Sequence, residues 1–197
     1  EQSGFINEIG FETYQKIMNE AIEELKENEF KDLYPEDENA PEKDFVKEIQ
    51  IDSDFELLFP DEYINNVSER LNLYNELSNV KNEAELIAYE QKLIDRFGPL
   101  PKQAIALLNS IRIKWTAIKL GIEKLVLKQG KIVAYFVSDQ QSEYYTSNQF
   151  QKVLQFVQKN GNLCRMKEKE TKNGLRLLLT FENVKSVKRA LELIEMI

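Results

Sequence analysis

The chain has 197 residues, which is enough for one large or two small domains with a stable core. It contains no histidine and one cysteine, Cys164, and this removes the Ser–His and Cys–His catalytic pairs, an internal disulfide and a thiolate metal cluster. The net charge of −8 comes from one segment, since residues 27–62 hold 14 Asp and Glu against 3 Lys and Arg. This acidic segment would repel DNA phosphates, and the composition favours a role without catalysis.

The first part of the chain predicts a helix followed by a linker. Helical spacing of apolar residues begins near Phe11. Residues 31–44 carry two prolines and a run of acids, which is typical of a solvated linker. The clustered acids lack the ligand spacing and turn glycine of a calcium loop, so solvation is favoured over cation binding. We therefore expect a region 1–30, a linker 31–44 and a domain 45–197.

The next part, up to residue 121, predicts an arm and three helices. Residues 45–60 alternate apolar and polar side chains, a pattern typical of a strand or an extended arm. The first helix is expected over about 61–79. The second begins at Asn82, which can form a capping box with Glu85, and its expected buried stripe is Leu86, Tyr89 and Leu93. The third begins near Pro101. Its apolar residues, spaced by three and four, predict a helix-packing seam: Ala104, Leu108, Ile111, Trp115, Ile118 and Ile122.

The stretch "LIDRFGPLP", residues 93–101, joins the second and third helices. Gly98 can take the left-handed conformation that ends a helix, and Pro99 prevents its continuation. Asp95 then lies in the last turn, where a carboxylate faces the negative end of the helix dipole. Either Arg96 compensates this charge, or Asp95 serves a contact outside the domain.

From residue 122 onward the pattern predicts two consecutive strand–strand–helix units. Two short strands lie within 122–138 and a helix over 147–160, and the pattern recurs with strands at 162–170 and 174–182 and a helix at 184–197. The expected fold class is α+β, with one four-stranded antiparallel sheet and both helices on one of its faces.

Two features of this part have alternative interpretations. Arg165, Lys167 and Lys169 share one face of a strand and form a weak candidate for a nucleic-acid-binding face. Because that strand offers no aromatic side chain for base stacking, a solvated face is favoured. Tyr144 and Tyr145 lie in a polar loop, where they either contact a partner or cover the edge of the sheet.

Three sequence blocks resemble one protein family. The segments "EQSGFINEIGFETY", "LFPDEYINNVSERLNLYNEL" and "LIDRFGPLP", the last followed by "LLNSIRIKWTAIKLGI", occur in this order. Together they resemble the C-terminal end of the bacterial transcription-repair coupling factors (Mfd). The resemblance covers about residues 1–122. The two strand–strand–helix units resemble the family in position and length more than in motif.

This resemblance implies a parent protein that is an ATP-dependent DNA translocase or helicase of the bacterial cytoplasm, with ATP and Mg²⁺ as cofactors. The parent would remove stalled RNA polymerase and recruit the DNA-repair subunit UvrA. The C-terminal domain would bind no cofactor or membrane, hydrolyse nothing and be monomeric. It would pack on the UvrB-like module of the same protein, mask the UvrA-binding surface and keep the protein autoinhibited.

The resemblance also carries over to a few residues. Gln2, Ser3 and Gly4 resemble the end of the translocation motif shared with the RecG helicase. The resemblance implies that acidic side chains on the helix ending in D-R-F-G form a docking surface for basic residues of the UvrB-like module. Asp95 matches this pattern, whereas Lys92 stands where an acid is expected and Glu90 would substitute for it. The alternative is a nucleic-acid-binding module that uses the basic strand.

Overall fold

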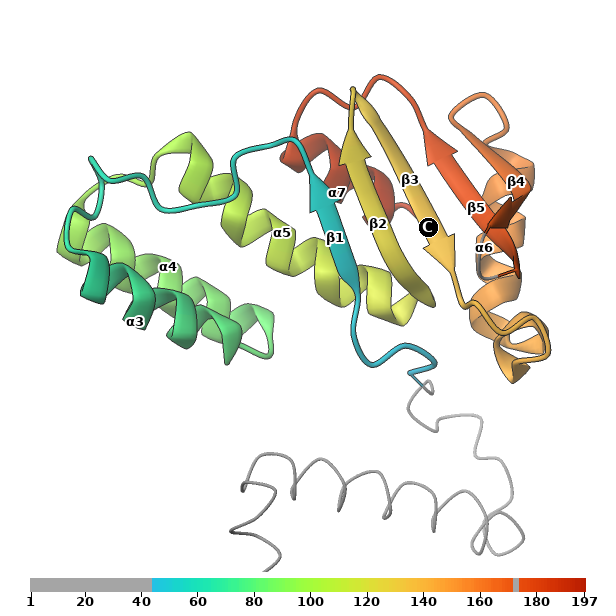
Figure 1. Ribbon diagram of the computed structural model, residues 1–197, viewed down its shortest axis with the longest axis horizontal. Coiled ribbons are helices and arrows are strands. Elements are labelled where there is room, and N and C mark those ends of the chain that lie inside the picture. Colours follow the sequence, from blue (N-terminus) through green and yellow to red (C-terminus); the bar gives the residue numbers. More distant parts are fainter. Residues whose placement is uncertain (1–43, 172–173) are drawn as a thin grey trace, which may run out of the picture. The chain divides into compact units, whose positions relative to one another are not determined.

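The structure of the protein is a computed structural model that describes residues 44–171 and 174–197 (Figure 1). The region expected over residues 1–30 and nearly all of the expected linker lie outside the described residues. Within the described residues, no helix has the length and apolar character that crossing a membrane requires.

The three helices expected after the arm are present as α3 (Val67–Ser78), α4 (Glu83–Phe97) and α5 (Lys102–Lys119). The first begins later than the expected residue 61, because Asn66 caps it by accepting a hydrogen bond from the Glu69 N–H at 3.0 Å. The preceding residues form a turn in which Tyr63 and Ile64 donate their N–H groups to the Pro60 carbonyl.

The sheet confirms the α+β class but has five strands instead of the expected four. β1 (Gln50–Ser53), β2 (Ile122–Lys128), β3 (Lys131–Phe136), β4 (Cys164–Thr171) and β5 (Gly174–Phe181) lie in the order β1-β2-β3-β5-β4. The fifth is β1, from the stretch interpreted as a strand or an arm, and it pairs parallel to β2. The other four strands pair with one another in antiparallel orientation, as expected.

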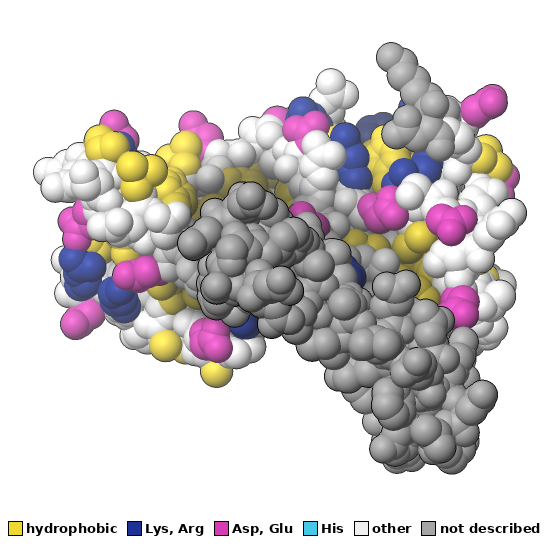
Figure 2. Space-filling view, turned by 60° about the horizontal axis from the view of Figure 1, so that its bottom comes forward, with side chains coloured by type: hydrophobic (Ala, Val, Ile, Leu, Met, Phe, Trp, Pro, Cys, Tyr) yellow, Lys and Arg dark blue, Asp and Glu magenta, His cyan; other side chains and the backbone are white. Residues whose placement is uncertain are grey.

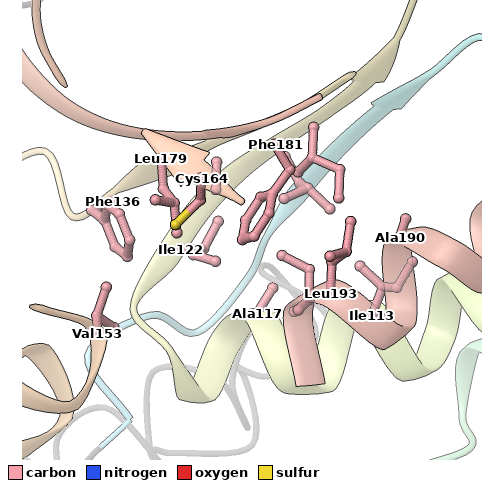
Figure 3. Packing of buried hydrophobic residues seen from close by; sticks show 14 of the residues in the cluster. Ile113, Ala117, Ile122, Phe136, Val153, Cys164, Leu179, Phe181, Ala190 and Leu193 are labelled. Carbon is pink, nitrogen blue, oxygen red and sulfur yellow. The ribbon is translucent and has the colours of Figure 1, made fainter. Parts of the chain in front are cut away.

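Helices cover one face of this sheet. α6 (Asn148–Lys159) and α7 (Val187–Glu195), together with α5, lie behind the sheet in Figure 1, which confirms the expected placement of the two C-terminal helices. The core between the layers is apolar (Figure 3), with Phe136, Cys164 and Phe181 at most 3 % exposed. We call the opposite side the outer face of the sheet.

A second apolar cluster holds the helical hairpin of α3 and α4 against the first half of α5. Leu73, Leu86, Leu93 and Leu108 are at most 1 % exposed in this cluster. The predicted seam packs on this cluster as far as Trp115, and its residue Ile118 packs on the cluster under the sheet. Ile113 and Ala117, which lie outside the predicted seam, also belong to the cluster under the sheet. Trp115 is partly buried against the helical cluster. α5 thus connects the helical hairpin, on which its first half packs, to the sheet, on which its second half packs.

The structure resolves the alternatives for Tyr144, which lies in the 3₁₀ helix η1 (Glu143–Thr146) and is fully buried. Its hydroxyl donates a hydrogen bond to the Leu120 carbonyl at 2.5 Å. Its ring lies against Gly121, whose φ of 73° is left-handed. Tyr145 is partly buried and donates to the Val137 carbonyl at 2.5 Å. Tyr144 is therefore a core residue that closes the α5–β2 turn.

Two buried tyrosine hydroxyls and a buried thiol predict that the protein loses stability in alkaline solution. Burial raises the pKa of Tyr89 and of Tyr144 above the ordinary value of 10.0, and it raises the pKa of the Cys164 thiol above 9.0. The unfolded chain therefore releases these protons at lower pH than the folded chain. The free energy of unfolding should be constant up to about pH 8 and fall progressively above about pH 9.

Urea unfolding at a series of pH values from 7 to 10.5 measures this dependence. Cys164→Ala removes the thiol, so the fall in stability in this variant should begin nearer pH 10 than pH 9. A free energy of unfolding that stays constant through pH 10.5 would contradict the assignment.

Candidate docking surface

The α4 helix has one buried side and one fully solvated side. Its buried residues are Leu86, Tyr89 and Leu93, as the sequence predicted. On the opposite side every residue is exposed, and we call this set the outer face of α4: Ala84, Ile87, Ala88, Gln91, Ile94 and Asp95. Ile87 is 48 % and Ile94 37 % exposed. The outer face of α4 thus combines two large apolar side chains with one carboxylate.

Asp95 is the charged group of this face. It is exposed in the last turn of α4, and within the described part of the chain it has no hydrogen-bond or ion-pair partner. Arg96 does not compensate it, because the guanidinium pairs with Glu69 on α3 and lies over the Phe97 ring at 5.0 Å. The compensation by Arg96 that the first sequence interpretation expects is therefore absent, and the second, a contact outside the domain, stays a prediction.

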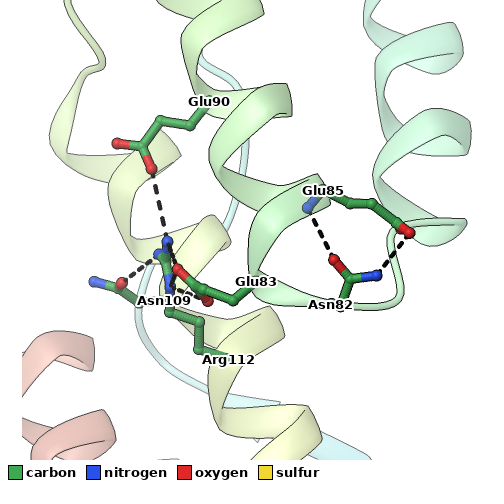
Figure 4. Close-up of polar contacts among 6 residues, drawn as sticks. All are labelled: Asn82, Glu83, Glu85, Glu90, Asn109 and Arg112. Atoms are coloured by element: carbon green, nitrogen blue, oxygen red, sulfur yellow. Dashed lines mark hydrogen bonds and ion pairs between the residues drawn. The ribbon is translucent and has the colours of Figure 1, made fainter.

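Glu90 lies on a different side of α4 (Figure 4). Its carboxylate is 3.7 Å from the Arg112 guanidinium of α5. Arg112 forms a closer pair with Glu83 at 2.7 Å, and its hydrogen bond to Glu83 is the main cause that raises the pKa of this arginine. Asp95 is five positions after Glu90, which places the two residues roughly 140° apart around the helix. The structure does not bring these two predicted residues together.

The expected pairing of Asn82 with Glu85 at the start of α4 is present, but the capping box is only half formed (Figure 4). The Asn82 Oδ1 accepts a hydrogen bond from the Glu85 N–H at 3.0 Å, and the Glu85 carboxylate accepts one from the Asn82 side-chain amide at 2.7 Å. A full capping box would bond this carboxylate to the Asn82 backbone N–H, whereas here it accepts from the Lys81 N–H at 2.8 Å. The same end of α4 carries Glu83, which fixes α5 through Arg112. The pair between Glu83 and Arg112 therefore fixes α4 relative to α5 at this end of the helix.

Lys92, at the position where the family resemblance predicts an acid, pairs with Glu76 of α3 at 2.6 Å. Together with the pair between Arg96 and Glu69, this contact bridges α3 and α4 along one side of the hairpin. A polar hollow of about 450 Å³ lies there, lined in part by Glu69, Glu76 and Arg96. Both basic side chains of α4 are thus neutralised by α3, so Asp95 is the unbalanced charge at this end of the helix.

The residues Ile87 and Ile94 were missed in the sequence. A signal for them existed, because both are apolar yet lie outside the stripe of Leu86, Tyr89 and Leu93. An apolar residue off the buried stripe is common on protein surfaces. Two such residues spaced by seven, and followed directly by Asp95, form a more specific pattern. Figure 2 shows that hydrophobic side chains reach the surface of the helical part, at the left of the view.

The basic strand residues lie on the outer face of the sheet. Arg165, Lys167 and Lys169 of β4 are all exposed, and they stand opposite Thr180, Leu178 and Arg176 of β5. Gln2, Ser3 and Gly4, the third predicted group, lie outside the described residues. In the part of the chain that the structure describes, no group of acidic, cysteine or histidine side chains has an arrangement suited to a metal ion.

Comparisons with known proteins point to one family. Residues 53–147 match the family described as TRCF domain. The transcription-repair-coupling factor of Rickettsia typhi is 30 % identical over 167 residues, which are 85 % of this chain and 13 % of that protein. The Escherichia coli protein of the same name is 37 % identical over 125 residues, 64 % of this chain and 10 % of that protein.

A solved structure gives the same result for the fold. It is described as the C-terminal domain of transcription-repair coupling factor, and the match has a TM-score of 0.58 at 18 % identity, covering 76 % of this chain and 88 % of that one. The chain spans only about one eighth of the length of the Rickettsia typhi relative. The comparisons therefore concern one domain of much longer proteins.

Proposed function

The chain belongs to the family of transcription-repair coupling factors, and from this membership we propose that it is a regulatory docking domain that binds through the outer face of α4. Its partner is the UvrB-like module of the same protein. In the docked state the domain covers the surface that binds UvrA and so keeps the parent protein autoinhibited. The domain itself has no catalytic role.

The observation that supports this proposal is the state of Asp95. A carboxylate in the last turn of a helix costs a few tenths of a kcal/mol when it is unpaired, and Asp95 has no partner within the described residues. The exposed Ile87 and Ile94 lie on the same face. A small apolar area beside a charge is suited to an interface in which the apolar part gives affinity and the charge gives specificity.

The proposal extends to the parent protein. There the domain would follow an ATP-dependent motor that moves on DNA in the bacterial cytoplasm, requires Mg²⁺ and displaces stalled RNA polymerase. Engagement with the polymerase would release the domain from the UvrB-like module and expose the site for UvrA. Regulation by a charged, salt-sensitive contact fits this role, because a docked domain of moderate affinity can be released.

Binding of the 197-residue chain to the separately produced UvrB-like module, measured by titration calorimetry at low salt, tests the proposal. Wild type should bind with micromolar affinity, and the affinity should decrease as the salt concentration rises. Asp95→Lys should weaken binding by about tenfold or more, since it replaces an attraction by a repulsion.

Glu195→Lys is the matched control, because Glu195 is also an exposed acid in the last turn of a helix, α7. Both changes should leave the free energy of unfolding unchanged or raise it by a few tenths of a kcal/mol, since a cation suits a helix C-terminus. Only Asp95→Lys should weaken docking. Equal affinity for both variants would refute the role of Asp95, and no binding by wild type would refute docking.

A further inference from the structure

The outer face of the sheet carries a row of four residues from four neighbouring strands. The strand register places Lys124 of β2 opposite Tyr135 of β3, Tyr135 opposite Leu178 of β5, and Leu178 opposite Lys167 of β4. Since adjacent strands are about 4.8 Å apart, the two lysines lie roughly 14 Å from each other with the tyrosine and the leucine between them. β4 has no aromatic residue of its own, and β3 supplies one to the same face.

The central pair of this row joins a buried leucine to a partly exposed tyrosine. Leu178 is only 7 % exposed although it belongs to neither the core cluster under the sheet nor the cluster of the helical hairpin. Tyr135, directly opposite it on β3, stays partly exposed. Because side chains directly opposite each other on one face of a sheet lie within contact distance, Leu178 can support the Tyr135 ring while the exposed part of the ring is available to a planar ligand.

The charge on this face is unbalanced. Three of its basic residues are neutralised, since Lys128 pairs with Asp52 at 2.7 Å, Arg176 with Glu123 at 2.7 Å and Lys131 with Glu182 at 3.2 Å. The others, which have no ion-pair partner within the described residues, are Lys124, Arg165, Lys167 and Lys169.

β4 separates its charges by side. The three basic residues 165, 167 and 169 alternate with Met166, Glu168 and Glu170, whose side chains point to the opposite side of the strand. Basic side chains gather around hydrophobic ones at the upper right of the view in Figure 2. Residues 44–197 hold 22 Lys and Arg against 21 Asp and Glu, so this concentration does not reflect an overall basic domain.

We propose that the outer face of the sheet binds single-stranded nucleic acid, with a base stacked on Tyr135 and phosphates paired with Lys124, Arg165, Lys167 and Lys169. In β4 these cations recur about every 6.6 Å, on one side of an extended strand that a flexible polyanion can follow. An unpaired base is needed because the bases of a duplex are stacked on each other and present only their edges in the grooves. This surface is separate from the outer face of α4, and the proposal does not depend on the docking function.

Fluorescence anisotropy with a labelled 20-nucleotide oligothymidylate and the 197-residue chain tests this inference. At low salt, binding should be in the micromolar range, and log K should fall against log salt with a slope of about −3, as four phosphate contacts to a single strand predict. A duplex of equal length should bind at least fivefold more weakly, because it offers no base for stacking.

Two sets of variants separate charge from stacking. Arg165→Glu combined with Lys167→Glu should reduce the affinity by tenfold or more. Lys185→Glu combined with Lys188→Glu, the same change of charge on two exposed residues just before and within α7, should have less than a twofold effect. Tyr135→Ser should reduce the affinity by about tenfold and Tyr135→Phe should restore it, since the stacking surface and not the hydroxyl is needed.

Three results would overturn the inference. The first is tight duplex binding that equals binding to the single strand. The second is an unchanged affinity in Tyr135→Ser, which would reduce the face to a general anion-binding surface. The third is displacement of the labelled oligonucleotide by polyglutamate as effectively as by unlabelled oligothymidylate of the same total charge, which would indicate an acidic polypeptide as the partner. Circular dichroism of each variant confirms that the fold is retained.

Discussion

Replacement of Gly121 by alanine is expected to lower the free energy of unfolding by about 3 kcal/mol. The φ of 73° at this position is left-handed, which costs a residue with a Cβ about 1–2 kcal/mol. The added Cβ would also lie less than 3 Å from three atoms of the Tyr144 ring, and such overpacking costs typically 1–3 kcal/mol. Tyr144 cannot move away easily, because it is fully buried and hydrogen-bonded to Leu120.

Gly130→Ala, in the turn between β2 and β3, is the matched control for Gly121→Ala. Gly130 also has a left-handed φ, 70°, but the nearest atom to an added Cβ is the Val184 carbonyl oxygen at an ordinary 3.9 Å. This variant should therefore lose only the backbone part, about 1 kcal/mol. Urea unfolding of both variants gives the comparison. Equal losses would show that the Tyr144 ring does not restrict the α5–β2 turn.

Leu93 and Ile94 are consecutive residues about 100° apart around α4, one buried and one exposed, and their replacement by alanine should separate stability from docking. Leu93 is completely buried in the helical cluster, so Leu93→Ala should lower the free energy of unfolding by about 3 kcal/mol. Ile94 is 37 % exposed, and Ile94→Ala should cost less than about 1 kcal/mol. Ile94→Ala should nevertheless weaken binding to the UvrB-like module by about fivefold.

Both variants are measured in the same two assays, urea unfolding and titration calorimetry at a temperature where each remains folded. Leu93→Ala should show the larger fall in the free energy of unfolding. Ile94→Ala should weaken binding to the UvrB-like module without a comparable fall in the free energy of unfolding. If Ile94→Ala binds as wild type does, the apolar part of the outer face of α4 is not in the interface.

Features that depend on neighbouring residues in the chain could be predicted from the sequence. The N-cap hydrogen bond of Asn82 with Glu85, the positive φ of Gly98 and the buried stripe of α4 are all present. Each is a local pattern whose physical cause lies within one or two helical turns. The two strand–strand–helix units and their helices on one face followed from periodicity in the same way.

Features that depend on contacts far apart in the chain could not be predicted. β1 pairs with β2 across more than sixty intervening residues, and a short alternating segment does not specify its partner. For the same reason the sequence did not show that Tyr135 lies on the same face as Lys167, because β5 separates their strands.

The candidate docking site shows the same division. Asp95 was identified from its unfavourable position at the end of a helix, which is a local property. The partners of the residues around it come from other helices: Glu76 for Lys92, Glu69 for Arg96 and Arg112 for Glu90. Only these pairings show that Asp95 is left without a partner in the described part of the chain.

The most direct test of the docking function is the binding of UvrA to the UvrB-like module in the presence of this chain. UvrA binding to the immobilised module is measured by surface plasmon resonance at increasing concentrations of wild type, Asp95→Lys or Glu195→Lys. The account predicts that wild type and Glu195→Lys suppress UvrA binding with the same concentration dependence, and that Asp95→Lys requires about tenfold more protein. UvrA binding that is unaffected by saturating wild-type chain would contradict the account.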